Sequence, residues 1–302
     1  MRILRIGTRD SKLALWQANK VKDLLAAKGI ETELVPVKSE GDLDLVTPLY
    51  AMGVEGVFTK TLDAYLLSDK IDIAVHSMKD VPTQLAEGIV QAAVLPRASH
   101  KDILVFPEGK GKLDVYSKIG TGSVRRKALL LHRYPNCELE NLRGNVQTRL
   151  KKLEVSDWDA AVFAEAGLSR MELLPAKYEV LDWMLPAPAQ GAIMIVCQEQ
   201  DKECFDTLVS LNDAKTATEV KIERDFLKTL MGGCSTPISA LAEIKEDKLF
   251  FKGHICSPDG STLVSHEQVF ELSEAAETGF IAGRAVLGKG GDVIVKQIRG
   301  KE

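Results

Sequence analysis

The sequence predicts an α/β protein of two sheet-and-helix domains followed by a smaller C-terminal α+β unit. The first observation is the alternation of short apolar runs with amphipathic segments, which is typical of βαβ units. The second is the length, because 302 residues exceed what one hydrophobic core usually organises. The third is a change of pattern near the C-terminus, where two strand-like segments follow a long helical one.

The first part of the chain has the alternation expected of a sheet covered by helices. Ser11 is placed to cap a helix that ends at Gly29, and Pro36 marks an edge strand or a bulge, since proline cannot donate a ladder hydrogen bond. Residues 41–56 are rich in Gly, Asp and Pro and predict a long loop. Strands are expected at residues 3–7, 33–38, 71–75 and 89–95, and a second helix at 58–67.

The same rhythm continues after Pro96 and then changes. Strands are expected at residues 103–106, 118–120, 138–142 and 160–164, with helices at 124–131 and 146–153. The segment PAPAQGA, from Pro186 to Ala192, is typical of a linker, and a strand at 193–198 can return to the first sheet. The tail predicts a helix at 218–230, strands at 238–245 and 249–256, a turn at 258–260 and a helix at 274–286.

These elements divide the chain into three units: residues 1–95 with 192–211, residues 96–191, and residues 214–302. Two α/β domains joined by two crossings, near Pro96 and Pro188, form a hinged pair with a ligand-binding cleft. Ligands of such sheets lie beyond the carboxyl ends of the strands. We therefore expect the functional residues in the loops that follow strands.

The composition limits the classes of function. The net charge is −4, whereas a nucleic-acid-binding protein normally carries a basic field. No apolar stretch is long enough for a membrane span, and the N-terminus lacks a signal-peptide cleavage site, so we expect a cytoplasmic protein. The five cysteines and five histidines have no metal-ligand spacing, so we expect no metal, and we expect Cys137, Cys197, Cys204 and Cys256 to be reduced thiols.

Basic residues follow the predicted strands in five places. Arginine predominates among them, which favours planar, bidentate recognition of carboxylate or phosphate. Because the five places lie on both α/β domains, we expect a large, polyanionic ligand. No Walker A motif or GxGxxG is present, so a nucleotide lacks its usual cradle. The five loops span residues 7–11, 76–80, 120–126, 142–145 (with Arg149 in the next helix) and 166–170.

The third of these loops gives the strongest indication of an anion. Its glycines and hydroxyls precede a helix and expose backbone N–H groups. Arg125 and Arg126 stand in the first turn of that helix, where the macrodipole disfavours each cation by about 0.3–1 kcal/mol. A bound anion would reverse this penalty, and the alternative is that both side chains project into water.

Asp80 and Cys234 differ from the residues around them. Asp80 is a carboxylate in a cationic loop, either paired with Lys79 or an arginine, or placed to stabilise a cation or accept a hydrogen bond from a ring N–H. Cys234 follows two glycines and is either a buried small hydrophobe or a nucleophile for a covalent attachment. His76 has no partner for a triad, and we expect it to be structural.

The residues alone leave two other functions open. A non-catalytic anion receptor explains the cleft and the arginines, but neither the missing secretion signal nor the setting of Cys234. Nucleic-acid binding through the arginine loops fits poorly with the acidic balance and an aromatic content of 6%.

Seven segments, in order, resemble the porphobilinogen deaminase family along nearly the whole chain. The matching segments are IGTRDSKLALWQA (6–18), DIAVHSMKDVP (72–82), GTGSVRR (120–126), LRGNVQTRL (142–150), AGLSRM (166–171), PAPAQGAI (186–193) and GGCSTPI (232–238). The resemblance implies two domains like periplasmic anion-binding proteins, and a third that carries a dipyrromethane cofactor joined by a thioether to Cys234. It also implies a monomer that condenses four porphobilinogen molecules, with loss of ammonia, and releases hydroxymethylbilane by hydrolysis.

The same resemblance implies the roles of individual residues. Asp80 is the catalytic residue, facing pyrrole N–H groups as ammonia leaves. Each pyrrole carries an acetate and a propionate, so the growing chain is a polyanion that suits the arginine loops. The residues implied in holding the cofactor and the chain are Arg9, Ser11, Ser77, Lys79, Thr121, Ser123, Arg125, Arg126, Arg143, Arg149, Arg170 and Gln190.

The sequence departs from the family pattern around the loop at 41–56. Glu55 stands where the family commonly has a lysine, and Glu40 where it has an arginine. Both changes reverse the charge, so we do not expect this loop to place the family's usual positive charge over the cleft. Lys60 is left to supply part of that charge. Gly122 replaces a common serine, and Ser235 with Thr236 is a less usual pair after the cysteine.

Overall fold

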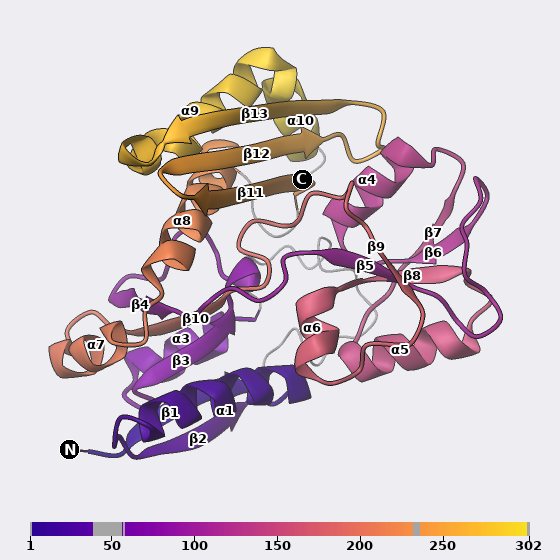
Figure 1. Cartoon of the computed structure of the whole chain (residues 1–302). Coiled ribbons are helices and arrows are strands. Elements are labelled where there is room, and N and C mark those ends of the chain that lie inside the picture. The colour runs from indigo at the N-terminus through magenta and orange to yellow at the C-terminus, as the bar shows by residue number, and fades with distance from the viewer. Residues whose placement is uncertain (1, 39–55, 57, 232–235, 301–302) are drawn as a thin grey trace.

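The described part of the protein contains three sheets, each with a hydrophobic core of its own. The structure is a computed structural model that describes residues 2–38, 56, 58–231 and 236–300. Figure 1 shows the three sheets as separate lobes, with helix α8 (Ala214–Thr229) running between the third lobe and the first. Two α/β domains and a small C-terminal α+β domain confirm the predicted fold class.

The first sheet combines N-terminal strands with one strand from later in the chain. Its order is β2-β1-β3-β10-β4, parallel from β2 to β3 and antiparallel around β10. Pro36 lies in the edge strand β2, where its missing N–H costs no hydrogen bond. The strands are β1 (Leu4–Arg9), β2 (Thr32–Val37), β3 (Ile73–Ser77), β4 (Ile89–Val94) and β10 (Ile193–Gln198), and the helices are α1 (Lys12–Ala26), α3 (Lys60–Leu67) and α7 (Lys202–Val209).

The second sheet has the order β7-β6-β8-β5-β9 and repeats the mixed pattern. The prediction of a loop at residues 166–170 is wrong, because these residues belong to helix α6 (Glu165–Arg170), which directly follows β8. Burial of Ala166 and Leu168 outweighs the helix penalty of Gly167. The strands are β5 (Asp102–Val105), β6 (Lys118–Gly120), β7 (Glu138–Glu140), β8 (Ala160–Ala164) and β9 (Tyr178–Val180), and the other helices are α4 (Val124–Arg133) and α5 (Val146–Val155).

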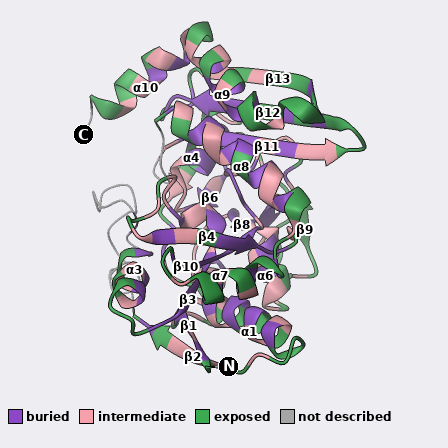
Figure 2. Cartoon of the chain, turned by 90° about the vertical axis from the view of Figure 1, so that its left-hand side faces the viewer, coloured by how far each residue is buried: buried purple, intermediate pink, exposed green. Residues whose placement is uncertain are grey.

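The third sheet is antiparallel, in the order β11-β12-β13, and is packed against α8 and α9. Gly279 lets α9 approach α8 closely, since a Cβ there would stand 2.4 Å from the carbonyl oxygen of Ile222. Figure 2 shows buried strands inside the lobes and the exposed outer sides of α7 and α10. The elements are β11 (Ile238–Lys245), β12 (Lys248–Cys256), β13 (Leu263–Glu271), α9 (Ala275–Val286) and α10 (Asp292–Arg299).

Helix α8 fixes both crossings between the first two sheets through one buried carboxylate. Glu223 is fully buried and accepts hydrogen bonds from Arg97 at 2.6 and 3.1 Å. It also accepts the N–H of Ala189 at 2.6 Å and that of Ala242, in β11, at 2.9 Å. Because Arg97 and Ala189 lie on the two crossings, Glu223 joins the hinge to the third sheet.

The structure shows the setting of four cysteines and the character of the described helices. Cys137, Cys197, Cys204 and Cys256 are free and buried, as expected of reduced structural thiols. None of the described helices is both long and apolar enough to cross a membrane.

The hinge carboxylate gives a stability prediction. Glu223→Gln should lower the free energy of unfolding by about 3–5 kcal/mol, because it leaves the Arg97 charge buried without its partner. Thermal and urea unfolding followed by circular dichroism measure the change. The control Lys296→Met removes an exposed ion pair with Asp292 and should change the same quantity by no more than about 0.5 kcal/mol. Equal effects of the two substitutions would contradict this role of Glu223.

Candidate active site

A cavity of about 580 Å³ opens between the first and second sheets. Its wall is formed by segments that follow β1 and β3 in the first sheet, by those that follow β6, β7 and β8 in the second, and by the hinge at 187–192. Leu227, Thr236 and Ile238 bring the third domain to the same wall. Among the described residues, the wall carries two carboxylates, Asp10 and Asp80, and the cationic side chains Arg9, Lys12, Lys79, Arg125, Arg126, Arg143, Arg149 and Arg170.

Most of the predicted site residues meet in this cavity. Thr121 does not, because it is buried behind the wall, where its N–H bonds to the Glu140 carbonyl at 2.9 Å. Lys60 is exposed at the start of α3 and is absent from the described wall. Cys234, Glu40 and Glu55 lie outside the described residues. The predicted residues on the wall are Arg9, Ser11, Ser77, Lys79, Asp80, Ser123, Arg125, Arg126, Arg143, Arg149, Arg170 and Gln190.

Local structure explains why the hydroxyl groups stand where they do. Ser11 caps α1 by accepting the Ala14 N–H at 3.4 Å, and Ser123 caps α4 by accepting the Arg126 N–H at the same distance. The helices therefore begin at the cavity wall, and their first-turn N–H groups face it. Ser77 is held by Gln17, whose amide Nε2 donates to its hydroxyl at 2.9 Å.

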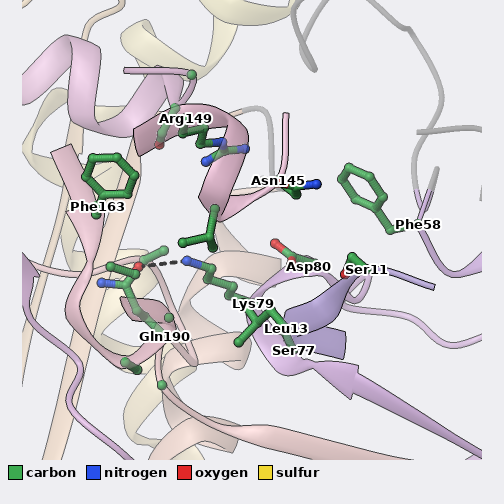
Figure 3. Close-up of a pocket in the computed structure, with 18 of the residues that line it drawn as sticks. Ser11, Leu13, Phe58, Ser77, Lys79, Asp80, Asn145, Arg149, Phe163 and Gln190 are labelled. Atoms are coloured by element: carbon green, nitrogen blue, oxygen red, sulfur yellow. Dashed lines mark hydrogen bonds between the residues drawn. The ribbon is translucent and has the colours of Figure 1, made fainter. Parts of the chain in front are cut away.

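Asp80 lies in a 3₁₀ turn, Met78–Asp80, that directly follows β3. Figure 3 shows its carboxylate pointing into the cavity, with Ser11 and Phe58 to one side and Asn145 and Arg149 across from it. The preceding Lys79 turns instead toward the hinge and donates to the side-chain oxygen of Gln190 at 3.1 Å. The strand and the tight turn thus place one carboxylate among the cations. His76, in strand β3, is buried, and burial lowers its pKa to about 4, in line with a structural role.

A buried carboxylate that the sequence analysis missed organises the cations. Asp102, at the start of β5, is fully buried and accepts hydrogen bonds from Arg125 at 2.5 Å and from Arg126 at 2.7 and 3.2 Å. It also accepts the amide of Gln190 at 2.9 Å. Through Gln190 it is linked to Lys79 on the opposite side of the cleft.

The Asp102 contacts revise the interpretation of the third loop. Arg125 and Arg126 are only 3% and 5% exposed, so the alternative that they project into water is wrong. The anion that offsets the unfavourable macrodipole is a carboxylate of the protein itself. Arg125 also donates to the Leu185 carbonyl at 2.8 Å, and Arg126 to that of Val162 at 2.9 Å, so both guanidinium groups are held rigidly.

The charges perturb one another's pKa values. Burial alone would raise the pKa of Asp102, but the charges of Arg125 and Arg126 outweigh it and hold that pKa well below its usual range. Burial lowers the pKa of Lys79 to about 8, with the nearby Asp80 opposing the shift. Burial and the neighbouring cations Arg126 and Arg143 lower the pKa of Arg149 to about 10. An excess of positive charge therefore remains in the cavity at neutral pH.

Aromatic side chains lie beside two of the cations on the wall. The Arg9 guanidinium lies 4.0 Å from the centre of the Phe58 ring, and that of Arg170 lies 5.7 Å from the Trp16 ring. Arg170 also donates to the Gly191 carbonyl at 2.7 Å and so reaches the hinge. Phe58 and Phe163 also line the cavity, and sequence reasoning missed them because an aromatic residue of a cavity has the same sequence pattern as one of the core.

Comparison with known families covers nearly the whole chain. Residues 4–206 match the family model described as "Porphobilinogen deaminase, dipyromethane cofactor binding domain", and residues 217–288 match "Porphobilinogen deaminase, C-terminal domain". The chain is 41% identical to porphobilinogen deaminase of Syntrophotalea carbinolica over 97% of its own length and 95% of the relative. It is 42% identical to the chloroplastic porphobilinogen deaminase of Oryza sativa, over 96% and 84% of the two chains.

A likeness to solved structures is more distant. A periplasmic substrate-binding protein of an ABC transporter from Coxiella burnetii is 14% identical, with a TM-score of 0.43 over 72% of this chain and 94% of that one.

Asp102 gives a pH-dependent prediction. Asp102→Asn should lower the free energy of unfolding at pH 7 by about 3–5 kcal/mol, because two buried arginines lose their counter-charge. The folded-state pKa is depressed, so this contribution is fully present above the unfolded value near 4 and is lost as pH falls toward the folded value. The advantage of the native protein should therefore be constant from pH 8 to about 5 and fall by about 1.4 kcal/mol for each unit below about 4.

Urea unfolding at a series of pH values measures this difference. The exposed substitution Asp206→Asn serves as the control and should leave stability within about 0.5 kcal/mol at every pH. A difference between the native protein and Asp102→Asn that does not depend on pH would show that the carboxylate charge is not what holds the arginines.

Proposed function

The chain belongs to the porphobilinogen deaminase family and is an enzyme of tetrapyrrole biosynthesis; on this premise we propose how its own residues carry out the reaction. The reaction condenses four porphobilinogen molecules, with loss of ammonia, onto a dipyrromethane cofactor and releases hydroxymethylbilane by hydrolysis. One observation carries the assignment of roles, namely the Asp80 carboxylate standing among buried and half-buried cations on one cavity wall.

The chemistry of the wall fits a dipyrromethane. Its two pyrroles carry an acetate and a propionate each, and the wall offers guanidinium groups that bind carboxylates in a planar, bidentate way. We assign these carboxylates to Arg9, Arg143, Arg149 and Arg170, together with the caps Ser11 and Ser123. When bound, the cofactor supplies the pyrrole ring to which each new unit is joined.

Asp80 is assigned the catalytic role because of the charge that develops as ammonia leaves. The departing amine leaves a cationic methylene-pyrrole, which the surrounding arginines would repel. A carboxylate fixed at the wall stabilises this cation without reorganisation and accepts a hydrogen bond from the pyrrole N–H. Asp80 thereby determines where in the cavity positive charge is tolerated.

Cys234 is assigned as the attachment point of the cofactor. Thr236, two residues after it, and Ile238, four residues after it, line the cavity, as does Leu227, seven residues before it. Two residues span at most about 7 Å, so the position of Cys234 in the chain supports a link from the third domain to the cavity. The described cysteines are all buried in cores and offer no such link.

Further assignments concern domains and partners. We take the domains as residues 1–95 with 192–211, residues 96–191 and residues 214–302, which agrees with the separate cores and with the return of β10 to the first sheet. We also propose that the enzyme acts as a cytoplasmic monomer without nucleic acid or membrane, in keeping with its net charge of −4. Light scattering after size-exclusion chromatography tests the monomer.

The role of Asp80 predicts the activity of two variants. Asp80→Asn should lower kcat about 10²–10³-fold, the range for removing one preorganised charge-stabilising group. Asp80→Glu keeps the charge but displaces it by ~1 Å and should cost about 10²-fold. Turnover of porphobilinogen is measured as uroporphyrin-like absorbance after acid and oxidation, with Asp206→Asn as the surface control. Normal turnover by Asp80→Asn would exclude the assigned mechanism.

The attachment at Cys234 predicts a covalent mass. Intact-protein mass spectrometry should show the native protein heavier than its sequence mass by two linked pyrrole units. The addition should disappear in Cys234→Ser and persist in Cys256→Ser, whose substituted sulfur is buried against α4. An unmodified Cys234 in freshly purified, active protein would contradict the assignment and would favour a non-catalytic anion receptor.

A further inference from the structure

Arg224, on α8, reaches the turn that carries Asp80 from outside the cavity. Its guanidinium donates to the carbonyl oxygens of Val81 at 2.9 Å and Pro82 at 2.5 Å, with a longer contact of 3.4 Å to that of Met78. These carbonyls bracket Asp80 in the sequence. Arg224 itself does not line the cavity.

Burying the Arg224 guanidinium costs free energy unless the carbonyl oxygens accept its hydrogen bonds. The side chain is largely enclosed, and burial lowers its pKa to about 10, so it is still cationic at neutral pH. A cation removed from water needs polar partners in compensation. Every hydrogen bond recorded for it among the described residues goes to the main chain of 78–82, and the neighbouring Asp225 is paired with Lys221 at 2.6 Å instead.

The other backbone hydrogen bonds of this turn both involve Met78, its first residue. The Met78 N–H bonds to the Ala192 carbonyl at 3.1 Å, and the Val81 N–H bonds back to the Met78 carbonyl at 3.1 Å. These bonds fix the place where β3 ends, but they leave the carbonyls after Asp80 without a partner in the sheet. A cation at the carboxyl end of a helical turn satisfies such carbonyls and matches their partial negative charge.

We propose that Arg224 is a positioning residue for Asp80, fixing the end of the Met78–Asp80 turn so that the carboxylate faces the cavity. The proposal rests on the catalytic role assigned to Asp80 above. In the sequence, helix α8 also precedes the segment that contains Cys234.

The expected signature is a loss of kcat with little change in KM. Arg224→Gln leaves the carboxylate-binding arginines untouched, so KM should change less than about 3-fold while kcat falls about 10- to 10²-fold, as for a displacement of ~1 Å. Arg224→Lys keeps the charge without the planar fork and should recover part of the rate. The control on the same helix is Lys221→Gln, whose exposed pair with Asp225 is remote from the turn, and it should keep the native kcat.

A double-mutant cycle with Asp80→Glu separates positioning from a merely structural role. If Arg224 acts through Asp80, the double variant Asp80→Glu with Arg224→Gln should lose less than the product of the two single losses. Rates are taken per mole of protein that carries the covalent adduct by mass spectrometry, well below the Tm of each variant. Should Arg224→Gln prove unfolded, Arg224→Lys takes its place in the cycle.

Two results would overturn the positioning role of Arg224 and leave the proposed function standing. One is a lowered Tm with an unchanged kcat per loaded molecule, and the other is a double variant whose losses multiply. In both cases the loss caused by Asp80→Glu would stand, and the proposed function with it. A native rate for Asp80→Glu itself would instead overturn the proposed function and, with it, the role of Arg224.

Discussion

Positive charge gathered at the carboxyl ends of two facing sheets is the constraint on which the rest of the structure depends. Guanidinium groups held this close repel one another, and the lowered pKa of Arg149, about 10, reflects both its burial and that repulsion. Asp102 relieves part of the repulsion by binding Arg125 and Arg126 from behind. The remaining charge faces the cavity, where a carboxylate-rich ligand completes the balance.

The same constraint explains how the domains are joined. The cleft has a wall from each sheet, so its geometry depends on the two crossings, and Glu223 holds both crossings against α8 through Arg97 and Ala189. Gln190, on the second crossing, bridges Asp102 and Lys79 across the cleft. One helix and two buried carboxylates therefore fix the relative position of the cations and Asp80.

The sequence predicted the local features well and the long-range ones poorly. Strand-end loops, the cap Ser11 and the alternation of strands and helices follow from local periodicity and capping chemistry. Arg97 and Glu223 are 126 residues apart, and nothing local marks them as partners. Asp102 has no local feature that distinguishes it from any other acidic residue at the start of a strand. The sequence analysis did not predict strand β13, because Phe270 is the only buried residue in it and no apolar alternation marks it. Tertiary burial decided these cases.

A crystal structure of the protein purified with its cofactor tests the central claim most directly. We expect two linked pyrrole rings in the cavity between the first two sheets, bonded to the Cys234 sulfur, with the Asp80 carboxylate within about 2.6–3.2 Å of a pyrrole nitrogen. Arginines of both sheets should contact the acetate and propionate groups. Rings lying outside the cavity, or an Asp80 carboxylate paired with an arginine and turned away from them, would contradict it.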